Sequence, residues 1–297
     1  MNHSEAPDGT RPARVVSVGR NSAWIAFEGS DELQLASLPK RLERLSLVPG
    51  DLVYAAILDA ERVIVERREP RSFALERRSG GRVKTMAANI DGIAIVSALA
   101  RPPFHAAMVD ELLAFAAIYQ ITAHLLLTKL DLAGPEAADQ IASLYRSLGY
   151  VVLTANPKAH VGVDAIEAAL RGHSTLLIGQ SGVGKSSLFR ALGGTATVGE
   201  VSATGRGRQT TTTGRLHHFD EGFLIDSPGV GEFELDGMST ADVANGFVEF
   251  VPLIGSCKFT DCSHTHEPGC AIIAAVDAGR IARSRFDSYS AIVGRSN

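Results

Sequence analysis

The segment that most constrains the fold is the run from Thr175 to Leu188, where an apolar stretch leads into a glycine turn and then into a sequence of helical character. From Gly179 to Ser186 it matches G-x-x-x-x-G-K-[ST], the pattern of a phosphate-binding loop. The glycines at 179, 182 and 184 let the backbone curl, so that successive N–H groups point toward an anion. The helix that follows adds its unpaired N-terminal amides and its dipole.

Two side chains inside this pattern carry further chemistry. Lys185 supplies a point charge for the terminal phosphates, and the Ser186 hydroxyl can ligate Mg²⁺. The preceding strand and the Lys-Ser pair distinguish the segment from an ordinary glycine turn between a strand and a helix. The sequence therefore predicts a binding site for a nucleoside triphosphate.

Composition bounds the rest of the chain. Its 297 residues suffice for two or three domains, and 45% of them are apolar, as in an ordinary soluble protein. No apolar run approaches the roughly 20 residues of a membrane span. Residues 1–12 are polar, so we expect a disordered arm and a cytoplasmic protein without a membrane partner. The net charge is −4, yet eight Lys and Arg residues lie between 62 and 84. This basic excess fits either contact with nucleic acid phosphates or a solvated hinge.

Residues 13–70 contain short, alternating segments rich in Val, Ile and Leu. Five strands are predicted at 13–18, 22–27, 32–38, 52–58 and 62–67. Pro49-Gly50-Asp51 predicts a turn, because proline presets one dihedral angle and glycine accepts the next. The pattern favours a small barrel of the OB type, although an SH3-like barrel would give a similar sequence. Trp24 is interpreted as a core residue rather than a base-stacking platform.

Residues 71–245 form the second predicted unit, beginning with a charged, glycine-containing linker at about 71–85. Apolar runs at 92–96, 123–127, 150–153 and 222–225 predict strands. Helical spacing at 108–118, 135–148 and 164–170 predicts helices between them. Such alternation indicates a parallel sheet covered on both faces. Residues 199–214 are polar and lack periodicity, which predicts a mobile segment.

Two short motifs lie at predicted strand ends. Asp226-x-x-Gly229 follows the strand at 222–225, where a carboxylate can hold Mg²⁺ through water and a glycine amide can contact a γ-phosphate. Thr128-Lys129-Leu130-Asp131 follows the strand at 123–127. Asp131 can accept two N–H groups from a guanine edge while the Lys129 stem covers the base plane. A polar turn would also fit the second motif.

The three cysteines of the chain are clustered near its C-terminus. Cys257-x₄-Cys262-x-His264-x₅-Cys270 supplies three thiolates and one imidazole, a complete tetrahedral set for one structural zinc ion. His266 is a competing ligand that we rank below His264. The surrounding sequence is polar and rich in Gly and Pro, so a metal would stabilise residues 246–297 in place of a core. Short helices are predicted at 271–282 and 285–293.

In combination these motifs resemble one family. Thr128–Asp131, Thr154-Ala155-Asn156, the phosphate loop, the threonine run at 210–213 and Asp226-x-x-Gly229 are the GTPase motifs in circularly permuted order. With a barrel before them and the Cys/His domain after them, they resemble the ribosome small-subunit-dependent GTPase A family. The resemblance covers nearly the whole chain from about Ala13. It includes Gly-Arg-Gly-Arg-Gln-Thr-Thr-Thr at 205–212.

The resemblance implies a GTPase that acts late in maturation of the small ribosomal subunit and is stimulated by that subunit. It also implies that both flanking domains touch ribosomal RNA; we expect a monomer. GTP or GDP would be bound by Gly179, Gln180, Ser181, Gly182, Val183, Gly184, Lys185, Ser186 and Ser187, and by Thr128, Lys129 and Asp131. Mg²⁺ would be bound by Ser186. The catalytic set would be Lys185, Gln209, Thr211, Asp226 and Gly229.

The chain departs from the family pattern at two of these positions. Thr128 stands where the family usually has asparagine, which predicts a weaker brace on the base pocket and a lower nucleotide affinity. Gln209 stands where the family usually has histidine, at the position associated with the attacking water. Two alternatives therefore remain at this stage. One is a nucleotide-dependent RNA-binding switch with negligible turnover, and the other is a non-ribosomal P-loop ATPase.

Overall fold

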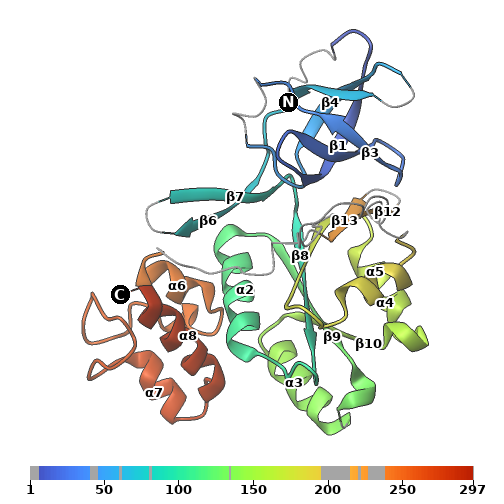
Figure 1. The fold of residues 1–297 in the computed structure, drawn as a ribbon. Coiled ribbons are helices and arrows are strands. Elements are labelled where there is room, and N and C mark those ends of the chain that lie inside the picture. Colours follow the sequence, from blue (N-terminus) through green and yellow to red (C-terminus); the bar gives the residue numbers. More distant parts are fainter. Residues whose placement is uncertain are drawn as a thin grey trace, which may run out of the picture.

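The computed structural model describes residues 7–40, 46–59, 62–79, 82–133, 135–194, 215–219, 222–226 and 238–296. Three parts are visible in Figure 1: an N-terminal barrel, a central sheet with helices, and a C-terminal helical part beside α2. Within the described residues, no helix combines the length and apolar character needed to cross a membrane. The predicted multidomain architecture is confirmed.

The N-terminal strands close into a barrel with the order β1-β2-β3-β5-β4, which is the predicted OB type. Alternate residues of β2 (Ala23, Ile25 and Phe27) are buried in the barrel core. Trp24 lies between them in sequence and is only half-buried, outside that core, so the prediction of a core tryptophan was wrong. The strands are β1 (Thr10–Val18), β2 (Ser22–Phe27), β3 (Leu33–Ser37), β4 (Leu52–Ile57) and β5 (Val63–Arg68).

The predicted disordered arm of residues 1–12 is wrong for its last three residues. Thr10, Arg11 and Pro12 are the first residues of β1 and pair with β4 at Ala56, Ala55 and Tyr54. This pairing closes the barrel. Backbone hydrogen bonding, which the side-chain pattern does not report, therefore extends β1 beyond its apolar residues.

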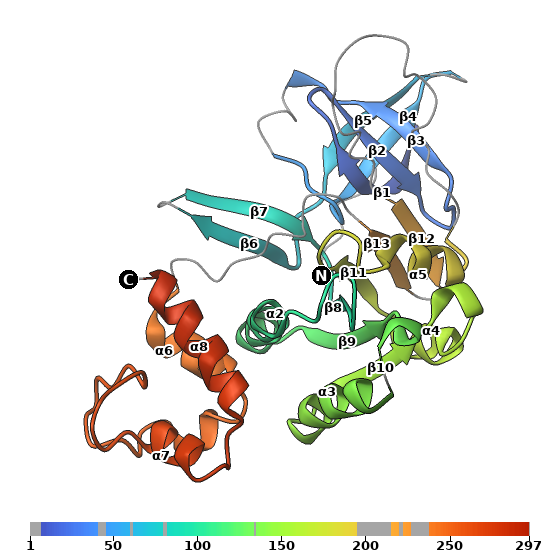
Figure 2. The same ribbon diagram turned by 60° about the horizontal axis from the view of Figure 1, so that its bottom comes forward.

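The predicted linker at about 71–85 contains a hairpin of β6 (Ala74–Ser79) and β7 (Arg82–Ala88), which the sequence analysis did not predict. Ser79 pairs with Arg82 across a two-residue connection. The Gly-Gly pair between two short β-prone runs is a hairpin signal. The hairpin projects from the molecule between the barrel and the C-terminal part (Figures 1 and 2).

The turn at 49–51 joins the barrel to the base of this hairpin. Gly50 has a φ of +88°, and a Cβ there would stand 1.9 Å from the Ala88 carbonyl oxygen, so only glycine fits. The buried Asp51 carboxylate accepts hydrogen bonds from the backbone N–H of Val48 at 2.8 Å and from Arg71 Nε at 2.7 Å. The bond to Asp51 outweighs desolvation and raises the pKa of Arg71. The barrel is therefore seated directly on the backbone at the end of β7.

The central sheet has the order β10-β9-β8-β11-β13-β12 and is parallel except for β12, an antiparallel edge strand that the sequence did not predict. Its strands are β8 (Gly92–Ala98), β9 (Thr122–Thr128), β10 (Val151–Ala155), β11 (Ser174–Ile178), β12 (Arg215–Phe219) and β13 (Gly222–Asp226). Its helices are α2 (Ala106–Tyr119), α3 (Pro135–Ser147), α4 (Val163–Leu170) and α5 (Lys185–Ala191). The predicted parallel sheet with helices on both faces is confirmed.

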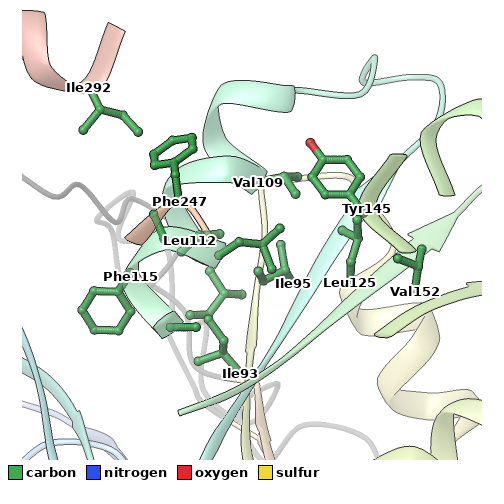
Figure 3. Close-up of a cluster of buried hydrophobic side chains, with 14 of the residues drawn as sticks. Ile93, Ile95, Val109, Leu112, Phe115, Leu125, Tyr145, Val152, Phe247 and Ile292 are labelled. Carbon is green, nitrogen blue, oxygen red and sulfur yellow. The ribbon is translucent and has the colours of Figure 1, made fainter. Parts of the chain in front are cut away.

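One continuous core joins the three parts. Ile93, Ile95 and Leu125 of the sheet pack with apolar residues of α2, and Phe247 and Ile292 of the C-terminal part belong to the same cluster (Figure 3). Val16 and Ala26 extend it into the barrel. Helix α2 is apolar on nearly all sides because it lies between the sheet and the C-terminal helices.

The C-terminal part contains α6 (Thr240–Gly246), α7 (Ala271–Asp277) and α8 (Arg283–Ser296). Helix α6 was not predicted, and it crosses the expected boundary at 245/246. Arg285 of α8 is buried and links the two parts, with Nη1 2.6 Å from Asp110 of α2 and Nε 2.7 Å from Glu249. Tyr145 of α3 donates its hydroxyl to the same Asp110 carboxylate at 2.7 Å. A buried ionic network therefore fixes the C-terminal part on the central domain.

Candidate nucleotide site and metal centre

The phosphate loop connects β11 to α5. Gly179 has a φ of +155°, and a Cβ there would stand 2.2 Å from the Val96 carbonyl oxygen on the neighbouring strand. Gly184, with a φ of +105°, is the N-cap of α5, which begins at Lys185. Strand, left-handed glycines and helix start therefore follow one another as the motif predicts, with the first-turn amides of α5 at the loop.

Lys185 folds back over the loop. Its Nζ donates to the carbonyl oxygens of Gly179 at 2.5 Å and Gln180 at 2.8 Å. Burial lowers the pKa of Lys185, and the charge of Asp226 opposes that shift. Asp226 ends β13, where it stands in register with Leu177 of β11. The predicted phosphate-binding lysine and the predicted Mg²⁺ carboxylate thus both lie at the C-terminal end of the parallel strands.

The other predicted phosphate and switch residues divide into two groups. Ser181, Gly182 and Ser186 are exposed on the loop and first turn of α5, Gln180 and Ser187 are half-exposed, and Val183 is buried. Gln209, Thr211 and Gly229 lie outside the described residues.

Thr128 braces the loop from the side. It ends β9, is almost fully buried, and its Oγ1 lies 2.5 Å from the Val183 carbonyl oxygen and 3.3 Å from that of Ser97. A hydroxyl has one proton, so the shorter contact to Val183 is its principal hydrogen bond. The threonine thus joins the segment proposed to contact the base to the phosphate loop, although it is shorter than the amide that the family usually has.

The two residues predicted to contact guanine, Lys129 and Asp131, follow Thr128 in the chain. Lys129 adopts the left-handed conformation, with a φ of +58°, and its Nζ donates to the Arg101 carbonyl oxygen. Asp131 is exposed on the 3₁₀ turn Leu130–Leu132 and accepts a hydrogen bond from Asn156 Nδ2 at 3.4 Å. Sequence reasoning did not assign site roles to Arg101 or Asn156. Asn156 could have been found as the end of the Thr154-Ala155-Asn156 motif.

The loop after β8 completes this side of the site. The Pro102 ring lies 4.0 Å from where a Cβ of Gly182 would stand, and Arg101 precedes it with an accepting carbonyl. This loop therefore lies between Lys129 and the phosphate loop. Nothing in its sequence marks it as part of a site, because its contribution is made by a carbonyl group and a ring edge.

The four predicted metal ligands are brought together. Cys257, Cys262, His264 and Cys270 offer ligand atoms that all lie within 4.8 Å of one another. His264 Nδ1 is 3.4 Å from Cys257 Sγ and 3.6 Å from Cys270 Sγ. His266 is exposed and lies outside the cluster. Its Nδ1 is 2.8 Å from the Thr265 hydroxyl oxygen. The preference for His264 is therefore supported by the geometry.

The loop that carries these ligands is fixed by Glu267. Its carboxylate accepts hydrogen bonds from the backbone N–H of Ser263 at 2.8 Å and of Thr265 at 3.2 Å, and from the Ser263 hydroxyl at 2.5 Å. Desolvation raises the pKa of Glu267, but the hydrogen bonds, chiefly from Ser263, outweigh it and hold the pKa well below the usual range. Burial lowers the pKa of His264 and so favours the neutral imidazole over the charged form. Neutral imidazole and thiolate donors suit a tetrahedral zinc ion.

A phosphate loop and an aspartate-ended strand meet at the C-terminal ends of neighbouring parallel strands, and the segment predicted to contact the base precedes them in the chain. This arrangement defines a P-loop GTPase domain of the circularly permuted class. The family model described as RsgA GTPase matches residues 68–236. The chain belongs to the RsgA GTPase family, as the sequence motifs suggested, and its enzymatic class is GTP hydrolase.

Similar proteins agree with this assignment. A curated protein from Azotobacter vinelandii, named small ribosomal subunit biogenesis GTPase RsgA, is 44% identical over 84% of this chain and 74% of its own length. A protein of the same name from Pseudomonas aeruginosa is 43% identical over 91% of this chain and 81% of its own length. The crystal structure of YjeQ from Thermotoga maritima matches with a TM-score of 0.72 and 27% identity over 97% of this chain and 98% of its own. The structure of YloQ, a circularly permuted GTPase, shares the fold. Its TM-score is 0.68, and the match has 22% identity over 100% of this chain and 98% of the YloQ chain.

Proposed function

We propose that this GTPase acts in late maturation of the small ribosomal subunit and that the subunit stimulates its turnover. The observation that carries the proposal is the arrangement of Thr128–Asp131, the phosphate loop and Asp226 at the C-terminal ends of neighbouring parallel strands. Relatives named small ribosomal subunit biogenesis GTPase, at 43–44% identity, support the choice of partner. The enzyme would work as a cytoplasmic monomer.

In this proposal the nucleotide is held from two sides. Asp131 and the Lys129 stem contact guanine, while the loop amides from 179 to 187 and Lys185 bind the phosphates. Ser186 and Asp226 would hold Mg²⁺, which would supply positive charge against the phosphates. Lys185 and the loop amides stabilise phosphoryl charge in the transition state, so catalysis is mainly positioning and electrostatics.

Three further roles follow from the family resemblance and from the sequence positions alone. Thr211 and Gly229 would contact the γ-phosphate, and Gln209 would orient the attacking water. A glutamine carbonyl can accept from water while its amide donates to phosphate. Because the amide does not titrate near neutral pH, the pH profile of turnover should lack an imidazole-like group near ~6.5.

The flanking parts would provide the ribosomal contacts. The barrel and the basic segment from 62 to 84 would bind ribosomal RNA phosphates, so affinity should fall steeply as the salt concentration rises. The Cys257, Cys262, His264 and Cys270 set would hold one structural zinc ion, which would fix the loop between α6 and α7 as a rigid RNA-contacting surface.

The test measures GTP turnover by the full chain with purified small subunits, with large subunits and with neither. We expect stimulation by the small subunit alone, and a loss of that stimulation when residues 1–68 are deleted. Equal turnover in all three conditions would reject the ribosomal role. Binding to the subunit without turnover would favour the RNA-binding switch, and preference for ATP would favour a non-ribosomal ATPase.

A further inference from the structure

The barrel touches the edge of the central sheet through one acidic side chain, Asp31, in the connection between β2 and β3. Asp31 Oδ1 accepts hydrogen bonds from the backbone N–H of His218 at 2.8 Å and lies 2.5 Å from His218 Nδ1. Its Oδ2 lies 3.0 Å from His217 Nδ1. Adjacent strand residues point to opposite faces, so one carboxylate reaches both only from the edge. Asp31 therefore caps the free edge of β12.

A second contact holds the neighbouring strand. The Arg14 guanidinium of β1 lies over the Phe223 ring of β13, 3.7 Å from its centroid. Burial lowers the pKa of Arg14 to about 10, against the opposing charges of Glu28 and Asp91. Phe223 stands opposite His218 in the β12–β13 register. The barrel thus contacts both strands of the β12–β13 hairpin.

This hairpin is connected to the nucleotide site at two places. Its second strand ends at Asp226, which is paired with Arg215 of β12. The centroids of the His217 and Phe189 rings lie 6.4 Å apart with their planes at 76°, and Phe189 belongs to α5, which starts at Lys185. A shift of β12 would therefore displace both Asp226 and the helix that begins at Lys185.

We propose that Asp31 is a positioning residue for GTP hydrolysis: it holds the β12–β13 hairpin so that Asp226 stays beside Lys185, and it makes the barrel part of the nucleotide site. Asp31 does not touch the nucleotide. The inference rests on the proposed function for the role of Asp226. Because coupling between two sites is reciprocal, ligands of the barrel and nucleotides at the loop would influence each other through this contact.

The kinetic test compares Asp31→Ala with Asp59→Ala, which removes a carboxylate from the β4–β5 turn, where it pairs with Arg62. We expect Asp31→Ala to lower kcat about tenfold, equivalent to ~1.4 kcal/mol. It should raise the Mg²⁺ concentration for half-maximal activity several-fold, with KM for GTP within about twofold. Asp59→Ala should match the parent. Parental kcat and Mg²⁺ dependence in Asp31→Ala would overturn the proposal.

Two further variants separate positioning from general destabilisation. Asp31→Asn keeps an acceptor for the His218 N–H, so it should recover part of the lost kcat. The double variant His217→Ala/His218→Ala removes both imidazole contacts but keeps the backbone N–H of residue 218, so adding Asp31→Ala should cost less than Asp31→Ala costs in the parent. Additive losses would mean that Asp31 acts elsewhere.

Hydrogen exchange gives a readout that does not need turnover. In Asp31→Ala the amides of β12 and β13 should exchange faster than in Asp59→Ala, while those of α8 stay unchanged. Unchanged protection of the hairpin would reject the role of Asp31 whatever the kinetics. A parent protein without GTP turnover would instead reject the proposed function, and the exchange result would still decide the role of Asp31.

Discussion

Replacing Thr128 by valine tests the brace between the base segment and the phosphate loop. Valine keeps the volume and the branched shape, so packing is conserved and only the hydroxyl is lost. The structure assigns that hydroxyl to the Val183 carbonyl at 2.5 Å, in a position with about 1% of the residue exposed. Thr128→Val therefore removes one buried hydrogen bond between the segment proposed to contact the base and the loop proposed to bind the phosphates.

The size of the effect follows from that burial. A buried acceptor left without its donor costs about 1–3 kcal/mol. If about 1–2 kcal/mol of this cost is taken from the free energy of nucleotide binding, because the loop is less well ordered, the affinity for nucleotide falls about 5- to 30-fold. The hydroxyl bonds the Val183 carbonyl and not a group proposed to contact the γ-phosphate, so GTP and GDP should weaken equally and kcat should stay near the parental value.

The assay is calorimetric binding of GTP and of GDP, with single-turnover kinetics beside it. Thr122→Val is the matched control, because Thr122 is exposed at the opposite end of the same strand. Thr128→Ser keeps the hydroxyl and should bind nearly as the parent does. Thr128→Asn restores the usual family residue. Because the hydroxyl already reaches Val183, this variant should gain no more than about threefold in affinity.

Two results would refute the reasoning. Parental affinity in Thr128→Val would mean that the hydrogen bond is not coupled to nucleotide binding. A gain of tenfold or more in Thr128→Asn would support the expectation from sequence, that the shorter side chain weakens the pocket.

Four other predictions follow from the structure. Asp131→Asn should shift preference from guanine to xanthine nucleotides, as competition binding would show, since an amide can donate to the carbonyl that replaces the guanine amine. The purified protein should contain one zinc per chain by metal analysis, and a chelator should unfold the C-terminal part while the central sheet keeps its circular dichroism. Arg285→Ala should lower the free energy of unfolding by about 3–5 kcal/mol in chemical denaturation, because it leaves Asp110 and Glu249 buried without a cation, whereas the exposed Arg283→Ala should have little effect. For Asp31, desolvation raises the pKa but hydrogen bonds from His218 and His217 outweigh it, so the pKa lies below its ordinary 3.8. Its stabilising contribution should be complete above about pH 4 and lost below it, so the stability difference between parent and Asp31→Asn should vanish in acid unfolding series.

The sequence was sufficient wherever a fold element has its own local signal. The phosphate loop is specified by glycines whose conformation no other residue adopts easily, and Gly179 has the close contact expected of such a position. The parallel strands are continuous apolar runs, and their helices carry the complementary stripe. The metal ligands lie close together in the chain, so their spacing alone brings them near one another.

Features made by tertiary pairing could not be predicted in the same way. Strand β12 has the sequence Arg-Leu-His-His-Phe, which lacks a clear alternation, and it forms because β13 offers a free edge. The partners of Thr128 and Lys129 are carbonyl groups, which are present at every residue and leave no trace in a sequence. Arg285 looks like an ordinary surface residue of an amphipathic helix until Asp110 and Glu249 are placed around it.

The seating of Gly50 against Ala88 has a mechanical consequence. A Cβ on Gly50 would stand 1.9 Å from the Ala88 carbonyl oxygen, so the two backbones pack too closely for any side chain between them. The Ala88 N–H also donates a hydrogen bond to the Pro49 carbonyl at 2.8 Å, which further fixes the 49–51 turn on the end of β7. Strand β8 begins four residues beyond Ala88 and ends beside Thr128, whose hydroxyl lies 3.3 Å from the Ser97 carbonyl. The barrel is therefore fixed to the backbone just before β8, and we expect a displacement of the barrel to move β8 and, with it, the segment proposed to contact the base.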